Sequence, residues 1–293
     1  MFILKRGSEG QEVKRMQGII DATPDGDFGS KTETALKEYQ TCHGLVADGI
    51  YGWKTQESMG TEVWAGIDVS AHNGVIDWEK VGKTNNKFAV IKLTEGRTHK
   101  NRRRKTNWNG AKENGLLVGG YHFGRPDTDK GPSDAVAEAK SFIKQLEYVG
   151  WERGVDLLPV LDAEAGMKTD DQYNAEWCTI FCEYMEAELG VKPIIYTAKW
   201  YWNAYLKNAN RLTLAKLCTY PVWWADYNAK NPVNPNLRGW NDWDIWQWTG
   251  YGSCSGMKGR VDQNWLPGGK EALERLKGLR NCCGTSPDCC DCC

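Results

Sequence analysis

The chain contains 293 residues, a length that suits one large domain and one small domain. Hydrophobic residues make up 41% and charged residues 26%, as in ordinary globular proteins, and the net charge of −1 argues against a globally basic nucleic-acid binder. Nucleic acid is therefore not expected as a partner. No apolar run reaches the roughly 18 residues of a transmembrane helix, so a membrane is not expected as a partner either. The amino-terminal residues lack the apolar core of a secretory signal, and we expect synthesis in the cytoplasm without a signal peptide.

The first 60 residues contain an internal repeat. Residues 25–36 (DGDFGSKTETAL) match residues 48–59 (DGIYGWKTQESM) in register. In each copy Asp-Gly begins a turn, and a helix is predicted after the second glycine. Apolar residues at helical spacing precede each copy. The pattern predicts a small all-α domain of three short helices over residues 1–60.

These residues resemble the small helical peptidoglycan-binding domain. The resemblance covers nearly all of residues 3–60, and both glycine turns and the glutamine pair at positions 17 and 40 are present. It implies attachment to the cell wall, so peptidoglycan is the expected partner. The ligand-binding face cannot be identified from the sequence.

After a short linker at 60–64, apolar runs alternate with amphipathic stretches. Strands are predicted at 65–69, 88–93, 116–122, 156–161, 193–197, 221–225, 243–248 and 259–264, and helices at 101–114, 133–149, 170–189, 199–206 and 270–279. This α/β alternation predicts an irregular (β/α)8-like parallel barrel over residues 65–280. The stretches 206–221 and 228–241 are predicted to be irregular.

Acidic residues stand at several predicted strand ends, where barrel enzymes hold their functional groups. The clearest signal is the Asp162-Ala-Glu164 sequence, because side chains two residues apart on a strand share a face, roughly 6.6 Å apart. Burial and like charge should raise one pKa and leave the other carboxylate ionised. Glycosidic cleavage needs such a proton donor and such an anion. With Asp68 and Asp262, the pair predicts an acidic cleft lined by aromatic residues.

Several segments together resemble the family-25 glycoside hydrolases, the Chalaropsis-type lysozymes. They are residues 66–70, 73–78, 88–96, 119–123, 159–164, 195–197, 223–227, 245–248 and 261–264, in the family's order from about 65 to 267. The resemblance implies a muramidase that cuts the β-1,4 bond from N-acetylmuramic acid to N-acetylglucosamine. Glu164 corresponds to the proton donor. Asp68, Asp162 and Asp262 correspond to the other acidic positions of the active site.

The remaining roles are hypotheses about the same cleft. We expect Asp162 to orient the substrate's acetamido group, and Asp68 and Asp262 to tune the pKa values and hold the sugar. Substrate contacts are expected from Tyr121, Tyr196, Trp224, Gln247 and Asp226, with core packing an equal alternative for the first four. Glu95 either lines the cleft or pairs with Lys92. Whether the acetamido oxygen is the nucleophile of a retaining reaction stays open.

Other classes of wall enzyme fit less well. The four histidines form no His-X-X-X-His pair, which argues against a zinc amidase or endopeptidase, and we predict no cofactor and no metal. Cys178 and Cys182 are interpreted as core residues of a helix rather than as nucleophiles. An N-acetylglucosaminidase or chitinase-type glycosidase is the competing enzyme, and a non-catalytic wall-binding protein is the competing binder.

Two segments fall outside this scheme. The basic run at 102–105 is interpreted as a solvated helix start, with attraction to anionic wall polymers as the alternative. The tail at 281–293 has six cysteines in its last 12 residues and is interpreted either as a metal-binding or cross-linking segment or as a dispensable one. The absence of a signal suits a phage endolysin acting on the bacterial wall. The oligomeric state is not predicted.

Overall fold

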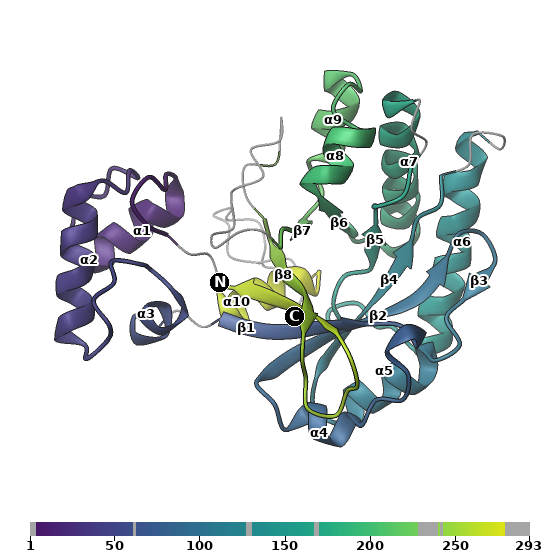
Figure 1. Ribbon diagram of the computed structural model, residues 1–293. Coiled ribbons are helices and arrows are strands. Elements are labelled where there is room, and N and C mark those ends of the chain that lie inside the picture. Colours follow the sequence, from purple (N-terminus) through teal and green to yellow (C-terminus); the bar gives the residue numbers. More distant parts are fainter. Residues whose placement is uncertain are drawn as a thin grey trace, which may run out of the picture.

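The amino-terminal region folds as three short helices, as predicted. The computed structural model describes residues 4–60, 63–126, 131–166, 170–227, 240 and 243–278. The helices are α1 (Gln11–Ile19), α2 (Ser30–Cys42) and α3 (Trp53–Ser58). They pack around a small apolar core that includes Val13, Phe28 and Leu36, each fully buried. Figure 1 shows this module beside the larger α/β unit.

A buried glutamine amide organises each copy of the repeat. Gln17 Nε2 lies 2.7 Å from Asp25 Oδ1 and 3.0 Å from Thr32 Oγ1, and the Gly26 N–H donates to Gln17 Oε1 at 2.9 Å. The second copy reproduces these contacts, with Gln40 bonded to Asp48, Thr55 and Gly49. Gly26 and Gly49 have φ angles of 86° and 71°, a conformation that strongly favours glycine. The repeated glutamine and Asp-Gly pairs are therefore explained by turn architecture.

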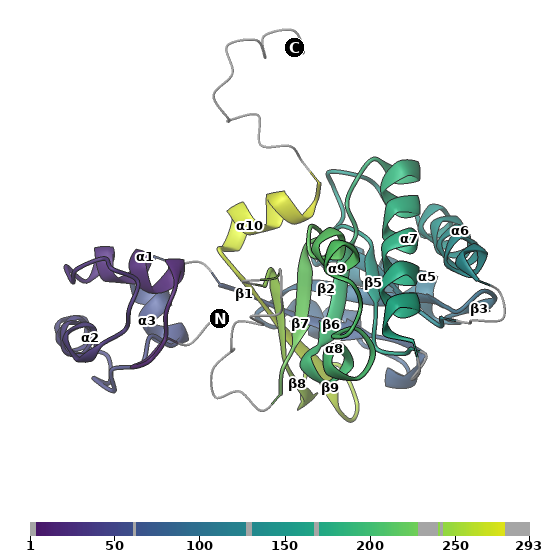
Figure 2. The ribbon, with the colours of Figure 1, turned by 90° about the horizontal axis from the view of Figure 1, so that it is seen from above.

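The larger unit is a closed eight-stranded barrel, which confirms the predicted fold class (Figures 1 and 2). Its strands are β1 (Val63–Val69), β2 (Asn86–Glu95), β4 (Leu117–Phe123), β5 (Val160–Asp162), β6 (Ile194–Ala198), β7 (Val222–Ala225), β8 (Ile245–Gly252) and β9 (Val261–Pro267). The pairing of β1 with β2 closes the ring, and the two-residue strand β3 (His99–Lys100) pairs with the end of β2.

One strand runs against the predicted direction. β9 is antiparallel to both of its neighbours, β1 and β8, whereas the sequence pattern predicted eight parallel strands. The eight residues between β8 and β9 are too few for the crossover that a parallel connection requires. Asp262 therefore lies near the start of β9, directly opposite Asp68 near the end of β1. The reversal still brings both carboxylates to the same rim of the barrel.

Helices cover the outside of the barrel. They are α4 (Trp78–Gly82), α5 (Arg104–Glu113), α6 (Pro132–Val149), α7 (Asp171–Leu189), α8 (Lys199–Tyr205), α9 (Arg211–Leu217) and α10 (Gly269–Leu276), with a 3₁₀ turn at Ala71–Asn73. α9 lies in a stretch that was predicted to be irregular. Its Asn210 side chain caps the amino end by accepting from the Thr213 N–H, and Leu214 and Leu217 are buried. None of the described helices has the length and hydrophobicity to cross a membrane.

The apolar core has two layers. One layer lies between strands and helices and contains Trp108, Trp177 and Trp224, while the other includes Phe88 and Trp223. Gly66 on β1 makes room for the Phe88 ring, because a Cβ there would lie 2.4 Å from that ring. Tight packing of this second layer leaves the polar cavity at the end where the parallel strands finish.

Candidate active site

A polar cavity of about 180 Å³ lies at this end of the barrel. Its lining comes from seven strands or the loops directly after them: Asp68, Tyr121, Asp162, Glu164, Tyr196, Trp223, Tyr227, Gln247 and Asp262. The four predicted carboxylates come from three distant parts of the sequence, and they meet in one cavity. Tyr121, Tyr196 and Gln247 line it as well.

Asp68 is held by two side-chain amides. Gln247 Nε2 and Asn264 Nδ2 both donate to Asp68 Oδ2, at 2.8 Å and 2.9 Å. Burial and the nearby charge of Asp262 raise the pKa of Asp68 to about 8, against the opposing effect of the two hydrogen bonds. A pKa of about 8 favours the protonated form of Asp68 at neutral pH.

The two amides are themselves fixed in orientation. The hydroxyls of Tyr196 and Tyr227 donate to Gln247 Oε1, which turns the Gln247 nitrogen toward Asp68. Trp223 Nε1 donates to Asn264 Oδ1 at 2.9 Å, so the Asn264 nitrogen also faces Asp68. Tyr227, Trp223 and Asn264 were not predicted as site residues, although all three lie in segments that resemble the family.

Asp162 and Glu164 differ from Asp68 in their partners. Asp162 Oδ1 is buried and has no hydrogen-bond partner among the described residues. Burial raises the pKa of Asp162 well above its usual value, and the charge of Glu164 adds to the effect. Burial also raises the pKa of Glu164, although the Lys92 ammonium opposes the shift.

Asp262 completes the acidic set. Its side chain is half-buried, and burial raises its pKa above the usual value. It faces Asp68 across the β1–β9 register and lines the same cavity. Among the described residues, no group of three or more His, Cys, Asp or Glu side chains is arranged to hold a metal ion. The clustered carboxylates can themselves supply acid, base and electrostatic chemistry.

Trp224 does not line the cavity, which favours core packing over substrate contact, the two alternatives predicted for this residue. It is only 1% exposed and packs in the layer between strands and helices, whereas its neighbour Trp223 faces the cavity. Successive residues on a strand point to opposite faces, so one of two adjacent tryptophans must point outward. The sequence pattern did not distinguish between the two.

An exposed groove of about 450 Å³ adjoins the cavity and shares three of its residues, Glu164, Tyr196 and Tyr227. Asp226 lines this groove rather than the cavity, along with Ala198, Lys199, Trp200, Asn203 and Ala225. Glu164 therefore stands where the two spaces meet. Asp162 lines the cavity but not the groove.

Glu95 belongs to an ion-pair network rather than to the cavity lining. Lys92 Nζ lies 2.7 Å from Glu95 Oε2, and the Arg125 guanidinium donates twice to Glu95 Oε1. Partial burial opposes ionisation, but Lys92 and Arg125 lower the pKa of Glu95 to about 2. Of the two predicted interpretations of Glu95, the structure therefore favours pairing with Lys92.

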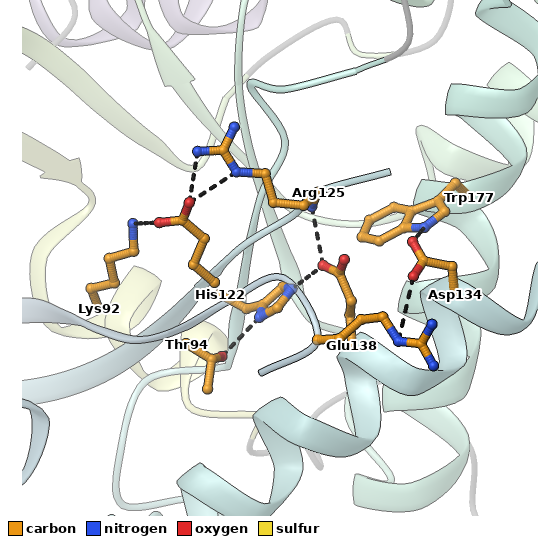
Figure 3. Close-up of polar contacts among 9 residues, drawn as sticks. Lys92, Thr94, His122, Arg125, Asp134, Glu138 and Trp177 are labelled. Atoms are coloured by element: carbon orange, nitrogen blue, oxygen red, sulfur yellow. Dashed lines mark hydrogen bonds and ion pairs between the residues drawn. The ribbon is translucent and has the colours of Figure 1, made fainter. Parts of the chain in front are cut away.

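A second buried pair anchors the loop that carries Arg125 (Figure 3). His122 Nε2 lies 2.7 Å from Glu138 on α6, and His122 Nδ1 lies 2.8 Å from Thr94 Oγ1. The Arg125 backbone N–H donates to Glu138 Oε2 at 3.0 Å. Helix α6 thus fixes the end of β4, and through Arg125 and Glu95 it fixes Lys92 beside the acidic pair.

A barrel with clustered carboxylates at this rim has the architecture of a glycoside hydrolase. Residues 67–257 match the family described as "Glycosyl hydrolases family 25", and residues 11–59 match "Putative peptidoglycan binding domain". The chain is 32% identical over 225 residues to "Lysozyme M1" of Streptomyces globisporus, covering 74% of this chain and 71% of that protein. It is 28% identical over 192 residues to the N,O-diacetylmuramidase of Chalaropsis sp, and the match covers 62% of this chain and 86% of that protein.

A solved structure shows the same fold. The bacterial lysozyme from Streptomyces coelicolor superposes with a TM-score of 0.63 at 30% identity, covering 73% of this chain and 97% of that one. The chain therefore belongs to family 25 of the glycosyl hydrolases and carries a peptidoglycan-binding module at its amino-terminal end.

Proposed function

We propose that this protein is a muramidase that cleaves the β-1,4 bond between N-acetylmuramic acid and N-acetylglucosamine in peptidoglycan. The observation that carries the proposal is the cavity in which Asp68, Asp162, Glu164 and Asp262 face one another with raised pKa values. A glycosidic bond breaks through a positively charged transition state, which needs a proton for the leaving oxygen and negative charge near the sugar carbon. The relatives named lysozyme and muramidase support the choice of bond.

Glu164 is the proposed proton donor. It stands at the junction of the cavity and the groove, where a leaving sugar has room to depart. Asp162, by contrast, lines only the cavity and not the groove. Burial raises the pKa of Glu164, as a proton donor at a glycosidic bond requires. A donor in this position delivers its proton to the glycosidic oxygen as the bond breaks.

Asp162 is the proposed partner of the substrate's acetamido group. Its buried Oδ1 has no hydrogen-bond partner among the described residues, and a substrate N–H provides one. With Glu164 as the proton donor, Asp162 is the proposed anion that stabilises the positive charge. Asp68 and Asp262 hold the sugar and keep the pKa values of the pair high.

The deciding experiment is digestion of purified peptidoglycan, followed by mass spectrometry of the reducing ends. New N-acetylmuramic acid reducing ends support the proposal. New N-acetylglucosamine ends would instead indicate the competing glucosaminidase, and Glu164→Gln should abolish either product. Unchanged cleavage by Glu164→Gln, in a variant that still binds the wall, would overturn the assigned role.

The two parts of the chain divide the work in this proposal. The barrel at 65–280 cuts the glycan, and the helical module at 1–60 attaches the protein to the bacterial cell wall. The match of residues 11–59 to a peptidoglycan-binding family supports the second part. The expected role as an endolysin stays a prediction, and the cysteine-rich tail at 281–293 lies outside the described residues.

A further inference from the structure

The cavity alone is too small for a glycan with its substituents. Its volume of about 180 Å³ falls below the roughly 300–1,000 Å³ of most small-molecule sites. A substrate bound at the carboxylates must therefore extend beyond the cavity. Of the spaces lined by described residues, the groove of about 450 Å³ adjoins it directly, through Glu164, Tyr196 and Tyr227.

The far wall of this groove is formed by helix α8. Lys199, Trp200 and Asn203 are exposed, and Trp200 exposes 54% of its surface. The Trp200 ring lies edge-on to Tyr201 and Tyr205, with centroids 5.9 Å and 6.4 Å away. These contacts hold a large apolar face in place at the groove without covering it.

Charge distinguishes the groove from the cavity. Lys199 is the one cation among the described residues that line either space. The described residues offer it no ion pair, although the carboxylates of Glu164 and Asp226 line the same groove. An anionic substituent would be repelled by the ionised carboxylates of the cavity but attracted to this ammonium. A neutral chitin-like strand has no group that pairs with it.

We propose that this groove binds the stem peptide on the N-acetylmuramoyl unit, with a peptide carboxylate paired to Lys199 and the apolar peptide side chains on Trp200. Peptidoglycan differs from chitin in this lactyl-linked anionic peptide. The groove thus selects peptide-bearing glycan over bare glycan at the same active site. This inference rests on the proposed muramidase function.

The test compares two soluble substrates from one batch of uncross-linked peptidoglycan: glycan chains with their stem peptides, and the same chains stripped by an amidase, which leaves the lactyl carboxylate on each N-acetylmuramoyl unit. For the full-length protein we expect a KM severalfold lower on peptide-bearing chains. Lys199→Met should raise that KM about two- to fivefold, the range for an exposed ion pair, and leave the KM for stripped chains unchanged. Trp200→Ala should raise it about tenfold with the same selectivity.

A matched control is Lys207→Met, which removes an exposed lysine just beyond the same helix and outside the groove. It should leave both KM values unchanged. An equal effect of Lys199→Met and Lys207→Met would indicate net charge alone and overturn the inference. Equal KM values of the unaltered protein on both substrates would also overturn the inference. An equal rise in KM on both substrates with Trp200→Ala would overturn it too, because it would indicate a sugar-binding site. Failure to cleave either substrate would instead reject the proposed function itself.

Discussion

Two buried polar side chains, Gln17 in the helical module and Asp162 in the barrel cavity, have opposite hydrogen-bonding environments. In the module, Gln17 has hydrogen-bond partners for both its amide nitrogen and its amide oxygen. In the cavity, Asp162 keeps a buried oxygen without a partner among the described residues. Satisfied buried groups stabilise a fold, whereas an unsatisfied one costs free energy unless a ligand completes it.

The carboxylates show the same contrast through their pKa values. The Asp27 backbone N–H and the Gln17 amide lower the pKa of Asp25 in the module. Burial and like charge raise the pKa of Asp68 to about 8 in the cavity. Donors around Asp25 favour its anion, while the cavity places four acids together with few donors. Raised pKa values in a cleft are typical of sites that transfer protons.

The largest effect is expected on catalysis, from substitution of Asp162, whose buried Oδ1 has no hydrogen-bond partner among the described residues. Asp162→Asn should reduce kcat on peptidoglycan at least about a hundredfold, because the anion that stabilises the transition state is lost. The same variant should unfold at a higher temperature at pH 7, since a repulsion between buried acids is removed. Initial rates and thermal unfolding measure the two. A variant that lost activity and stability together would make Asp162 a structural group like Gln17.

The reverse outcome is expected in the module. Gln17→Ala leaves the Gly26 N–H and the Asp25 carboxylate without their partner, and it should destabilise the module by about 2 kcal/mol. Gln40→Ala should match it, because the second copy has the same contacts. Binding to intact walls should weaken in both, while the rate on soluble glycan chains stays unchanged. Exposed Lys31→Ala is the control, and an equal loss there would remove the special role of the buried amides.

Much of this contrast was predictable from the sequence, because strand ends in a barrel converge by topology. Asp68, Asp162 and Glu164 lie where the apolar runs at 65–69 and 156–161 end, and the structure brings them together. The pattern of residues in β9 does not reveal its direction, because alternation along a strand is the same in either direction. The short connection from β8 was the signal in the sequence that indicated an antiparallel strand.

Other features depended on tertiary packing. The choice between Trp223 and Trp224 rests on which face of β7 turns inward, and both residues are equally apolar. The two amides that hold Asp68 came from β8 and β9, and only the closed barrel places them beside β1. Glutamine and asparagine carry no charge pattern that signals such a contact in a sequence.

The third prediction concerns pH and Asp68. The folded pKa of about 8 lies above the ordinary value of 3.8, so the native state binds a proton that the unfolded chain has released. This difference makes the free energy of unfolding fall as pH rises between about 4 and 8. Asp68→Asn should remove that part of the slope and gain on the order of 5 kcal/mol at pH 8 relative to pH 4, because about four pKa units separate the folded and unfolded states.

Asp25→Asn is the matched control for this measurement. The pKa of Asp25 is lowered from 3.8, so its ionisation changes stability only at more acidic pH. Denaturant unfolding between pH 5 and 8 should show the same slope for Asp25→Asn as for the unaltered chain. A slope that persists in Asp68→Asn would mean that another group of the acidic cluster retains the proton.

The smallest effect is expected at Glu95, whose environment is intermediate between those of Gln17 and Asp162. Glu95 is charged, paired and half-buried. Glu95→Gln removes the anion that holds Lys92 at 2.7 Å and also binds Arg125. Stability should fall by less than about 1 kcal/mol at pH 7 after solvent screening. Since the pKa of Glu95 is lowered to about 2, its contribution is present above pH 4.5 and lost as pH falls toward 2.

Activity gives a sharper measurement of the same variant. Without the Glu95 carboxylate, the Lys92 charge beside Asp162 and Glu164 is less fixed, and the alkaline limb of the rate profile should shift by a few tenths of a pH unit. Exposed Glu113→Gln should leave the profile in place. A profile unchanged in Glu95→Gln would limit the network to anchoring the β4 loop and would leave the raised pKa values to the cavity alone.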